Sequence, residues 1–213
     1  VNNDFGKGGR DLIIKALESR GIKVGLDLSS DPGQLDFSSV VLKVKSSSAD
    51  ALFAYTNEEE SARLLRELKK QGYKKPVLGE TVLTSQKVIE LAGDAANGAI
   101  AHVGLTADAP QPGVKKFDDA FQKEFGSRSD HNGLKGYIGM YTVKAVTEKL
   151  GKFDAKAFAA AMKNISLSAK THLGLLLDLS YDENGDLDRE SYLTTVANGK
   201  QVVSAILPPV GKK

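Results

Sequence analysis

The chain has 213 residues, of which 41% are hydrophobic and 26% are charged, a composition that is ordinary for one large globular domain or two small ones. Its 29 basic and 27 acidic residues leave a net charge of +2 with no long run of one sign, which argues against a nucleic-acid-binding face. The longest apolar runs are only a few residues, so we expect no membrane span. The lack of cysteine excludes disulfides and thiolate chemistry.

The first predicted elements are a helix, a strand and a second helix. Asn2-Asn3-Asp4 predicts a loop, and the helix that follows it runs to Arg20, with Gly21 just past its end. Apolar residues then alternate with other residues over 22–28, a spacing that predicts a strand. Asp36 is a candidate cap for the next helix, although the consecutive valines of that segment would also suit a strand.

Residues 49–85 predict a complete strand–helix–strand unit. The strands are 50–55 and 76–78, and the helix between them starts after Asn57 with three glutamates, which suit the positive end of the helix dipole. Two strands joined by one helix run parallel, with a right-handed crossover. Tyr55-Thr56-Asn57 and Glu80-Thr81 are therefore expected at one edge of the sheet, beyond the carboxyl ends of the strands, where open α/β sheets bind ligands.

A change of character after residue 106 suggests a domain boundary. A helix over 86–92 and a strand over 99–103 complete an α/β pattern that predicts a doubly wound parallel sheet. Residues 107–113, with two prolines and a glycine, are the best linker candidate. Three helices follow, at 114–125, 134–150 and 154–164, with no strand between them. The middle helix is apolar nearly all round, as expected of a helix buried on more than one side, and no strands remain to cover it.

The last segment predicts short strands and a hairpin. Residues 175–177 and 179–181 are short apolar runs, and Asp182-Glu183-Asn184-Gly185 is a turn. Two longer apolar runs, 192–197 and 201–207, flank Asn198-Gly199, which is the strongest short hairpin signal. The remaining residues, to Lys213, are expected to form a loose tail.

No motif of enzyme chemistry is complete. Gly6-Lys7-Gly8-Gly9 lacks the spacing of a phosphate-binding loop. Residues 182–190 alternate oxygen-bearing side chains as a calcium loop does, but Leu187 stands where that loop needs glycine. The three histidines have no metal-ligand spacing, and no nucleophile signature is present. We therefore predict a protein that is not an enzyme and that uses no metal and no cofactor.

Seven short motifs carry a family resemblance through their order and spacing. They start at Asn3 (NDFGKG), Gln71 (QGY), Leu91 (LAGDAANG), Asn132 (NGLKGY), Gly151 (GKFD), Asp182 (DENGD) and Val196 (VANGK). Together they resemble the type I periplasmic solute-binding proteins of ABC transporters, in the leucine/isoleucine/valine-binding branch, over essentially the whole chain. The resemblance implies the α/β periplasmic binding protein type I fold, in which two lobes close on a small ligand.

The resemblance also implies how the chain divides. Residues 1–106 would be the second ligand-binding lobe, with its doubly wound parallel sheet. Residues 107–168 would be helices of the other, first lobe, and residues 169–213 would cross back to the second lobe as a hairpin. Most of the first lobe, including its sheet, is missing from this sequence. That absence would account for three helices without a sheet to cover.

Ligand-binding residues of the family map onto this sequence motif by motif. The second lobe's aromatic contact maps to Phe5, and a second aromatic region maps to Tyr55-Thr56-Asn57. The acidic residue that holds a ligand ammonium maps to the turn at Glu80-Thr81, with Thr81 at the aligned position and Glu80 one residue earlier. Either Glu80 supplies that contact or the ligand is not an α-amino acid. From the first lobe, the helix entry that contains Leu134 would line the cleft.

The expected function is the solute-binding component of an ABC importer in the periplasm. It would capture a small solute, with a branched-chain amino acid as the first candidate, and present it to the membrane permease. The missing first lobe would be a separate chain, or a second copy of this chain would cover the exposed helices. The alternatives are a ligand-sensing domain of a receptor or regulator with the same fold, and a flavodoxin-like domain that binds a cofactor at the sheet edge.

Overall fold

The computed structural model describes residues 1–211; Lys212 and Lys213, which belong to the expected tail, lie outside the described residues. The chain divides into two compact units. The first contains Val1–Val103 and Leu193–Ser204, and the second contains Gly104–Tyr192 and the described residues from Ala205 onward. Within residues 1–211 the chain therefore passes between the units after Val103, after Tyr192 and after Ser204.

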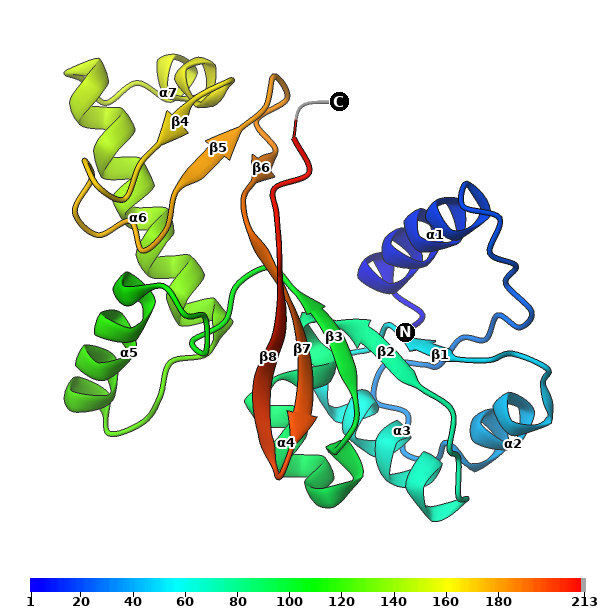
Figure 1. Cartoon of the computed structure of the whole chain (residues 1–213). Coiled ribbons are helices and arrows are strands. Elements are labelled where there is room, and N and C mark those ends of the chain that lie inside the picture. The colour runs from blue at the N-terminus through cyan, green and yellow to red at the C-terminus, as the bar shows by residue number, and fades with distance from the viewer. Residues whose placement is uncertain (212–213) are drawn as a thin grey trace. The chain divides into compact units, whose positions relative to one another are not determined.

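The first unit is built on a five-stranded sheet with the order β1-β2-β3-β7-β8 (Figure 1). Strands β1 (Leu52–Ala54), β2 (Val77–Glu80) and β3 (Ile100–Val103) run parallel, with Ala54 paired to Gly79 and Gly79 paired to Ala101. The parallel strand–helix–strand unit predicted from residues 49–85 is confirmed. Its second strand is longer than predicted, because the ladder with β3 continues to Glu80.

The last two strands of this sheet are the predicted hairpin. Strands β7 (Ser191–Ala197) and β8 (Lys200–Leu207) are joined by Asn198-Gly199, whose φ angles are 51° and 72°. Positive φ at both turn residues is the geometry of the two-residue hairpin turns that Asn-Gly favours. The backbone N–H of Val196 donates a hydrogen bond to the carbonyl of Ala99, and the hydroxyl of Thr194 donates one to the carbonyl of Ala101. The partner on β3 advances as β7 is followed backwards, so these two strands are antiparallel.

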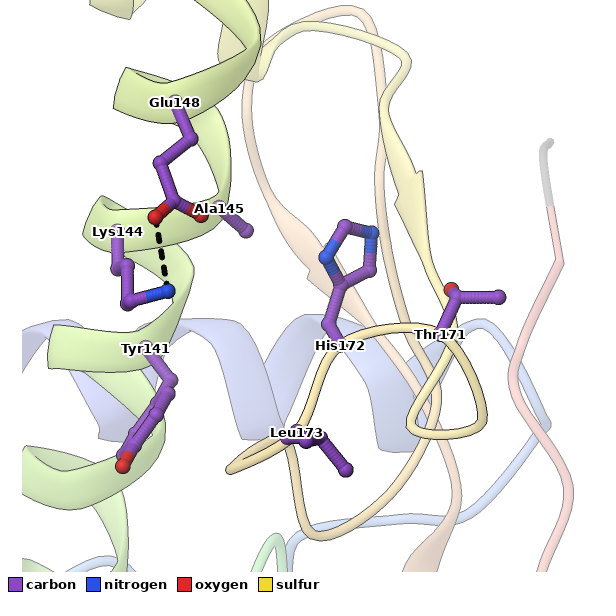
Figure 2. Close-up of a pocket in the computed structure, with 7 residues that line it drawn as sticks. All are labelled: Tyr141, Lys144, Ala145, Glu148, Thr171, His172 and Leu173. Atoms are coloured by element: carbon purple, nitrogen blue, oxygen red, sulfur yellow. Dashed lines mark ion pairs between the residues drawn. The ribbon is translucent and has the colours of Figure 1, made fainter.

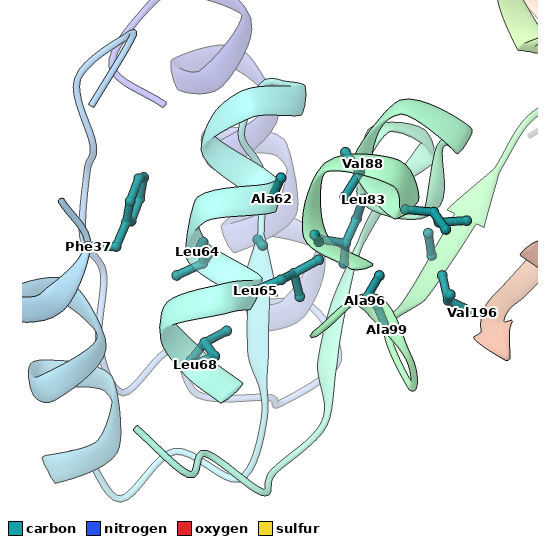
Figure 3. Packing of buried hydrophobic residues seen from close by; sticks show 14 of the residues in the cluster. Phe37, Ala62, Leu64, Leu65, Leu68, Leu83, Val88, Ala96, Ala99 and Val196 are labelled. Carbon is teal, nitrogen blue, oxygen red and sulfur yellow. The ribbon is translucent and has the colours of Figure 1, made fainter. Parts of the chain in front are cut away.

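Helices α3 (Glu58–Lys70) and α4 (Gln86–Ala92) supply much of the apolar core of this unit. In Figure 3, Leu65 of α3 points toward Leu83 and Ala96, and the apolar stripe of this helix, formed by Leu64, Leu65 and Leu68, is buried. Asn57 is the first flanking residue of α3, but its side chain makes no capping hydrogen bond. The remaining helical elements of the unit are α1 (Asp4–Glu18), α2 (Ser38–Ser46) and the 3₁₀ turns η1 (Thr81–Thr84) and η2 (Gly93–Ala96).

The strand predicted over 22–28 is wrong. These residues form no strand, and Ile22, Leu26 and Leu28 remain exposed. The alternating pattern is that of a half-buried strand, but a strand needs a neighbour for its backbone groups. Strand β1 is the outermost strand on this side of the sheet, and no described strand pairs with residues 22–28. The alternating apolar pattern of residues 22–28 is therefore present, but the segment has no neighbouring strand to pair with among the described residues.

The second unit contains the three predicted helices and a small antiparallel sheet. The helices are α5 (Pro112–Phe125), α6 (His131–Leu150) and α7 (Ala155–Met162). The sheet joins β4 (Ser166–Leu167), β5 (Leu179–Tyr181) and β6 (Leu187–Asp188). Residues 175–177, predicted as a short strand, are a buried loop. The loop lies where the backbone of Leu176 approaches Gly113 at the start of α5.

Helix α6 is buried along one stripe and not on several sides as its sequence predicted. The buried stripe runs from Leu134 through Ile138 and Thr142 to Val146. Met140 and Val143, on another face, are 68% and 40% exposed. The apolar surface expected on these helices is thus present, and within the described residues no sheet covers it.

Candidate functional site

Six of the seven predicted site residues lie in the first unit. The loop Tyr55-Thr56-Asn57 follows β1, and Glu80-Thr81 stands at the end of β2. Because Ala54 pairs with Gly79, the two chain segments leave the sheet side by side at its carboxyl edge. The Thr56 hydroxyl lies 2.7 Å from that of Ser61 on α3, which ties this loop to the helix that follows it. The predicted edge therefore brings both segments together.

Aromatic rings gather at this edge. Phe5 stacks on Tyr55 with ring centroids 4.5 Å apart, and Phe53 stacks on Tyr55 with ring centroids 6.4 Å apart. Tyr55 thus contacts both other rings, and these three rings, which join α1 to β1, are called the aromatic row below. Phe5 and Phe53 are 45% and 42% exposed, so part of the apolar surface of the row is accessible from outside the protein.

The close approach of α1 to Tyr55 depends on Gly9. A Cβ atom added at Gly9 would lie 2.3 Å from the Tyr55 ring, far inside contact distance. The glycine-rich start of this helix lacks the spacing of a phosphate-binding loop, and Gly9 within it makes room for the ring of Tyr55. Burial and, to a lesser degree, the negative charge of Glu80 raise the pKa of Tyr55 above its ordinary value. Its hydroxyl is therefore protonated at neutral pH and available as a donor.

The turn that carries Glu80 and Thr81 is folded tightly on itself. Glu80 accepts a hydrogen bond from the backbone N–H of Val82 at 2.9 Å, which fixes its carboxylate at the start of η1. The side chain of Leu83 folds back over Gly79, where an added Cβ would meet Leu83 Cδ2 at 2.7 Å. Both Glu80 and Thr81 are half-buried. The carboxylate therefore has a defined position beside Tyr55 and not that of a solvated surface residue.

Leu134 lies apart from the other six residues, in the second unit. It is in the first turn of α6, and its side chain is fully buried. The entry to this helix is capped by Asp130, which accepts hydrogen bonds from the N–H groups of Asn132 and Gly133 at 2.9 Å. Sequence position placed Leu134 at a helix entry, but its burial depends on tertiary packing that the sequence pattern does not show.

Two hollows are found elsewhere on the units. One, of about 200 Å³, lies between α6 and the loop at 171–173, where Lys144 and Glu148 form an ion pair of 2.8 Å beside His172 (Figure 2). The other, of about 460 Å³, lies beside α1 and is lined in part by Lys7, Arg10 and Asp27. None of the seven predicted residues lines either hollow. In residues 1–211, no group of three or more His, Asp or Glu residues is placed to hold a metal, and no helix is long and apolar enough to cross a membrane.

A model of the periplasmic binding protein family matches residues 1–201. The chain belongs to the periplasmic binding protein family. The family inferred from the seven motifs is thereby confirmed. One relative is the Leu/Ile/Val-binding protein homolog 1 of Brucella abortus (strain 2308), which is 28% identical over 192 residues. The match covers 89% of this chain and 49% of the relative, so this periplasmic binding protein chain spans about half the length of such relatives.

Solved structures confirm the fold. The leucine-binding protein LivK of Thermotoga maritima MSB8 superposes with a TM-score of 0.83 at 22% identity, over 97% of this chain and 58% of LivK. A solute-binding protein of an ABC transporter from Rhodopseudomonas palustris BisB5, in complex with 3,4-dihydroxybenzoic acid, gives a TM-score of 0.69 at 24% identity, over 83% of this chain and 50% of that one. At these identities the likeness establishes the α/β periplasmic binding protein fold.

Proposed function

We propose that this chain is part of the solute-binding component of an ABC importer and that Phe5, Tyr55, Glu80 and Thr81 contact the solute. The observation that carries the proposal is the pairing of an exposed aromatic row with a fixed carboxylate at one sheet edge. An apolar surface with a few placed polar groups is what small-molecule sites require. Thr56 and Asn57, in the same loop, would add polar contacts. The site performs binding and no catalysis, as in the solute-binding proteins that make up this family.

A branched-chain amino acid is the first candidate for the solute. The carboxylate of Glu80, close enough to Tyr55 to influence its ionisation, would attract the ammonium group of an amino acid. The aromatic row would cover an aliphatic side chain. The relative from Brucella abortus is named as a Leu/Ile/Val-binding protein, which is consistent with this choice.

An aromatic carboxylic acid is the second candidate. The stacked rings of Phe5 and Tyr55 favour a planar ligand, and the Rhodopseudomonas palustris protein was solved with a dihydroxybenzoic acid. Such a ligand has no ammonium group, so its carboxylate would have to lie away from Glu80. The charge at position 80 therefore separates the two candidates.

We further propose that the exposed apolar face of α6 is covered by a partner. The chain matches about half of its relatives' length, and the apolar side chains of Met140 and Val143 on α6 are exposed. The first candidate is the missing first lobe, as a separate chain, and the second is another copy of this chain. Leu134 would then border the cleft through its helix entry. The assembled protein would act outside the cytoplasm, where closure of its lobes on the solute presents a surface to the permease.

The test is a nuclear magnetic resonance titration of the 213-residue chain with leucine and with 4-hydroxybenzoate, at millimolar concentration. We expect leucine to shift the resonances of Phe5, Tyr55 and Glu80, with weak affinity because half of the cleft is missing. Glu80→Gln should reduce the response to leucine and increase that to 4-hydroxybenzoate. Shifts of α6 and the 171–173 loop alone would contradict the site. Micromolar or tighter binding of leucine would contradict the expectation that the 213-residue chain contains only half of the cleft.

A ligand-sensing domain of the same fold would share this site but would have no permease partner. Co-purification with an ABC permease distinguishes the two, because only an importer component binds the permease. A flavodoxin-like function is not supported, since the family of this chain consists of solute-binding proteins.

A further inference from the structure

Thr84, Thr194 and Gln201 form a buried hydrogen-bonded chain beside the turn that carries Glu80. The hydroxyls of Thr84 and Thr194 lie 2.9 Å apart, and both side chains are fully buried. The side-chain amide of Gln201 donates to the carbonyl and the hydroxyl of Thr84, at 2.8 and 2.9 Å. Thr194 and Gln201 follow Thr84 in the sequence by 110 and 117 residues. The end of the turn is thus held by the terminal hairpin of the sheet.

The direction of these hydrogen bonds follows from the number of hydrogens. The Thr194 hydroxyl donates to the carbonyl of Ala101 at 3.3 Å. A threonine hydroxyl has one hydrogen, so Thr194 accepts from Thr84, and Thr84 in turn accepts from Gln201. The chain of donors therefore runs from β8 through η1 and β7 to β3. Each hydroxyl both donates and accepts, and such chains strengthen their members in a dry interior.

Ala101 links this series of hydrogen bonds to the other end of the same turn. Its backbone pairs with Gly79, the residue directly before Glu80. Its carbonyl receives the hydrogen bond that starts, through Thr194, at Thr84. The segment from Gly79 to Thr84 is therefore fastened to β3 at its beginning and, through two hydroxyls, at its end. Glu80 pairs with His102 at the end of the ladder and so belongs to the first fastening, and Thr81 lies between the two fastenings.

We propose that Thr84, Thr194 and Gln201 are positioning residues of the ligand site: they hold the 79–85 turn in the geometry that presents Glu80 and Thr81 to a solute. The proposal rests on the proposed function, because it assigns these two residues to the site. The three residues act through the turn and make no ligand contact of their own. It follows that the hairpin β7–β8, although far from the site in sequence, is part of the binding machinery.

The test is amide hydrogen exchange of the 213-residue chain, without ligand, in matched variants. Thr194→Val keeps the side-chain shape and removes the acceptor of Thr84, and Thr194→Ser keeps the hydroxyl. Thr142→Val is the control, because Thr142 is another buried threonine but donates within α6 of the second unit. We expect Thr194→Val to speed exchange in residues 82–85 by about tenfold or more, since it removes the acceptor of the buried Thr84 hydroxyl hydrogen. Exchange in α3 should be unchanged, as should the turn in Thr194→Ser and Thr142→Val.

Two results would overturn the proposal: equal acceleration throughout the first unit, which means a merely structural role, and no change in the turn. If Thr194→Val does not fold, Gln201→Met removes the first donor of the hydrogen-bonded series and must give the same local effect. Hydrogen exchange requires no solute, so its outcome is independent of the proposed function. If leucine and 4-hydroxybenzoate both fail to shift Glu80 while the turn still responds to Thr194→Val, the proposed function fails, and the three residues anchor the turn without positioning a ligand site.

Discussion

The ring of Phe5 stacks on the ring of Tyr55 at an angle of 26°, with centroids 4.5 Å apart, and this contact joins the first turn of α1 to the end of β1. Gly6 is the one fully buried residue of α1, so this helix makes few other packing contacts that would hold it against the sheet. The stack therefore serves two roles in the proposed site. It attaches a helix, and it shapes the apolar surface that a solute would meet.

Substitution of Gly9 tests how closely α1 rests on Tyr55. Alanine is favoured over glycine inside a helix by about 1 kcal/mol, so Gly8→Ala, whose Cβ meets no atom within 4 Å, should stabilise the chain by about that amount. Gly9→Ala should lose this gain and push the Tyr55 ring off Phe5, because its Cβ would lie 2.3 Å from that ring. Thermal unfolding and the ring resonances of Tyr55 measure the two effects. Equal stabilisation with an unmoved Tyr55 would contradict the geometry.

Ionisation of Tyr55 should depend on Glu80. Burial, first, and the charge of Glu80, second, raise the pKa of Tyr55 above 10.0. Glu80→Gln should therefore lower this pKa only in part, as measured by pH titration of the tyrosine ring carbon. Tyr73 is the control, since burial alone raises its pKa. An unchanged pKa of Tyr55 in Glu80→Gln would mean that the carboxylate does not act on the ring.

The same raised pKa predicts how stability falls in alkali. The folded state keeps the Tyr55 proton at pH values where the unfolded chain has lost it. The free energy of unfolding therefore decreases as the pH rises from about 10 through the folded-state pKa, and the contribution is fully present below that range. Urea unfolding at a series of pH values, compared with Tyr55→Phe, measures it. A pH dependence above 10 that is identical in the two proteins would exclude a contribution from Tyr55.

Local patterns predicted the elements whose formation is decided locally. Asn198-Gly199 between two apolar runs gave a hairpin, and the stripe of Leu64, Leu65 and Leu68 gave a helix with the correct buried face. The expected strand at 22–28 failed because a strand also needs a pairing partner, which is a property of the whole sheet. The meeting of the 55–57 loop with Glu80 was predictable because parallel pairing of β1 and β2 follows from their single connecting helix.

The polar chain through Thr84 could not be predicted in the same way. Thr84 is separated from Thr194 and Gln201 by more than one hundred residues, and a threonine in a strand is also common on an exposed face. Leu134 shows the opposite case, because its motif placed it at a cleft while its packing turned the side chain inward. Both depend on which elements become neighbours, and periodicity along the chain does not encode that.

Gly79 should tolerate no side chain. A Cβ there would lie 2.7 Å from Leu83 Cδ2 and 2.9 Å from the carbonyl oxygen of Ala54, and the second of these atoms belongs to the backbone of the neighbouring strand β1. We expect Gly79→Ala to destabilise the first unit by about 1–3 kcal/mol, the usual cost of overpacking. Gly25→Ala, at an exposed glycine with no atom within 4 Å of its Cβ, should change stability little. Urea unfolding measures both, and similar values for the two would contradict the tight turn.

The uncovered face of α6 should make the isolated chain associate. Gly136, Met140 and Val143 follow one another at helical spacing, so they share one face of the helix, and Met140 is 68% exposed. Burying such a face removes apolar surface from water, so the mass measured by sedimentation should rise with protein concentration. Met140→Glu should hold the chain as a monomer, because it would place a charge in the buried contact. Leu35→Glu, at a leucine of the first unit that is 78% exposed, should leave association unchanged. A wild-type chain that stays monomeric at all concentrations would contradict a self-associating face.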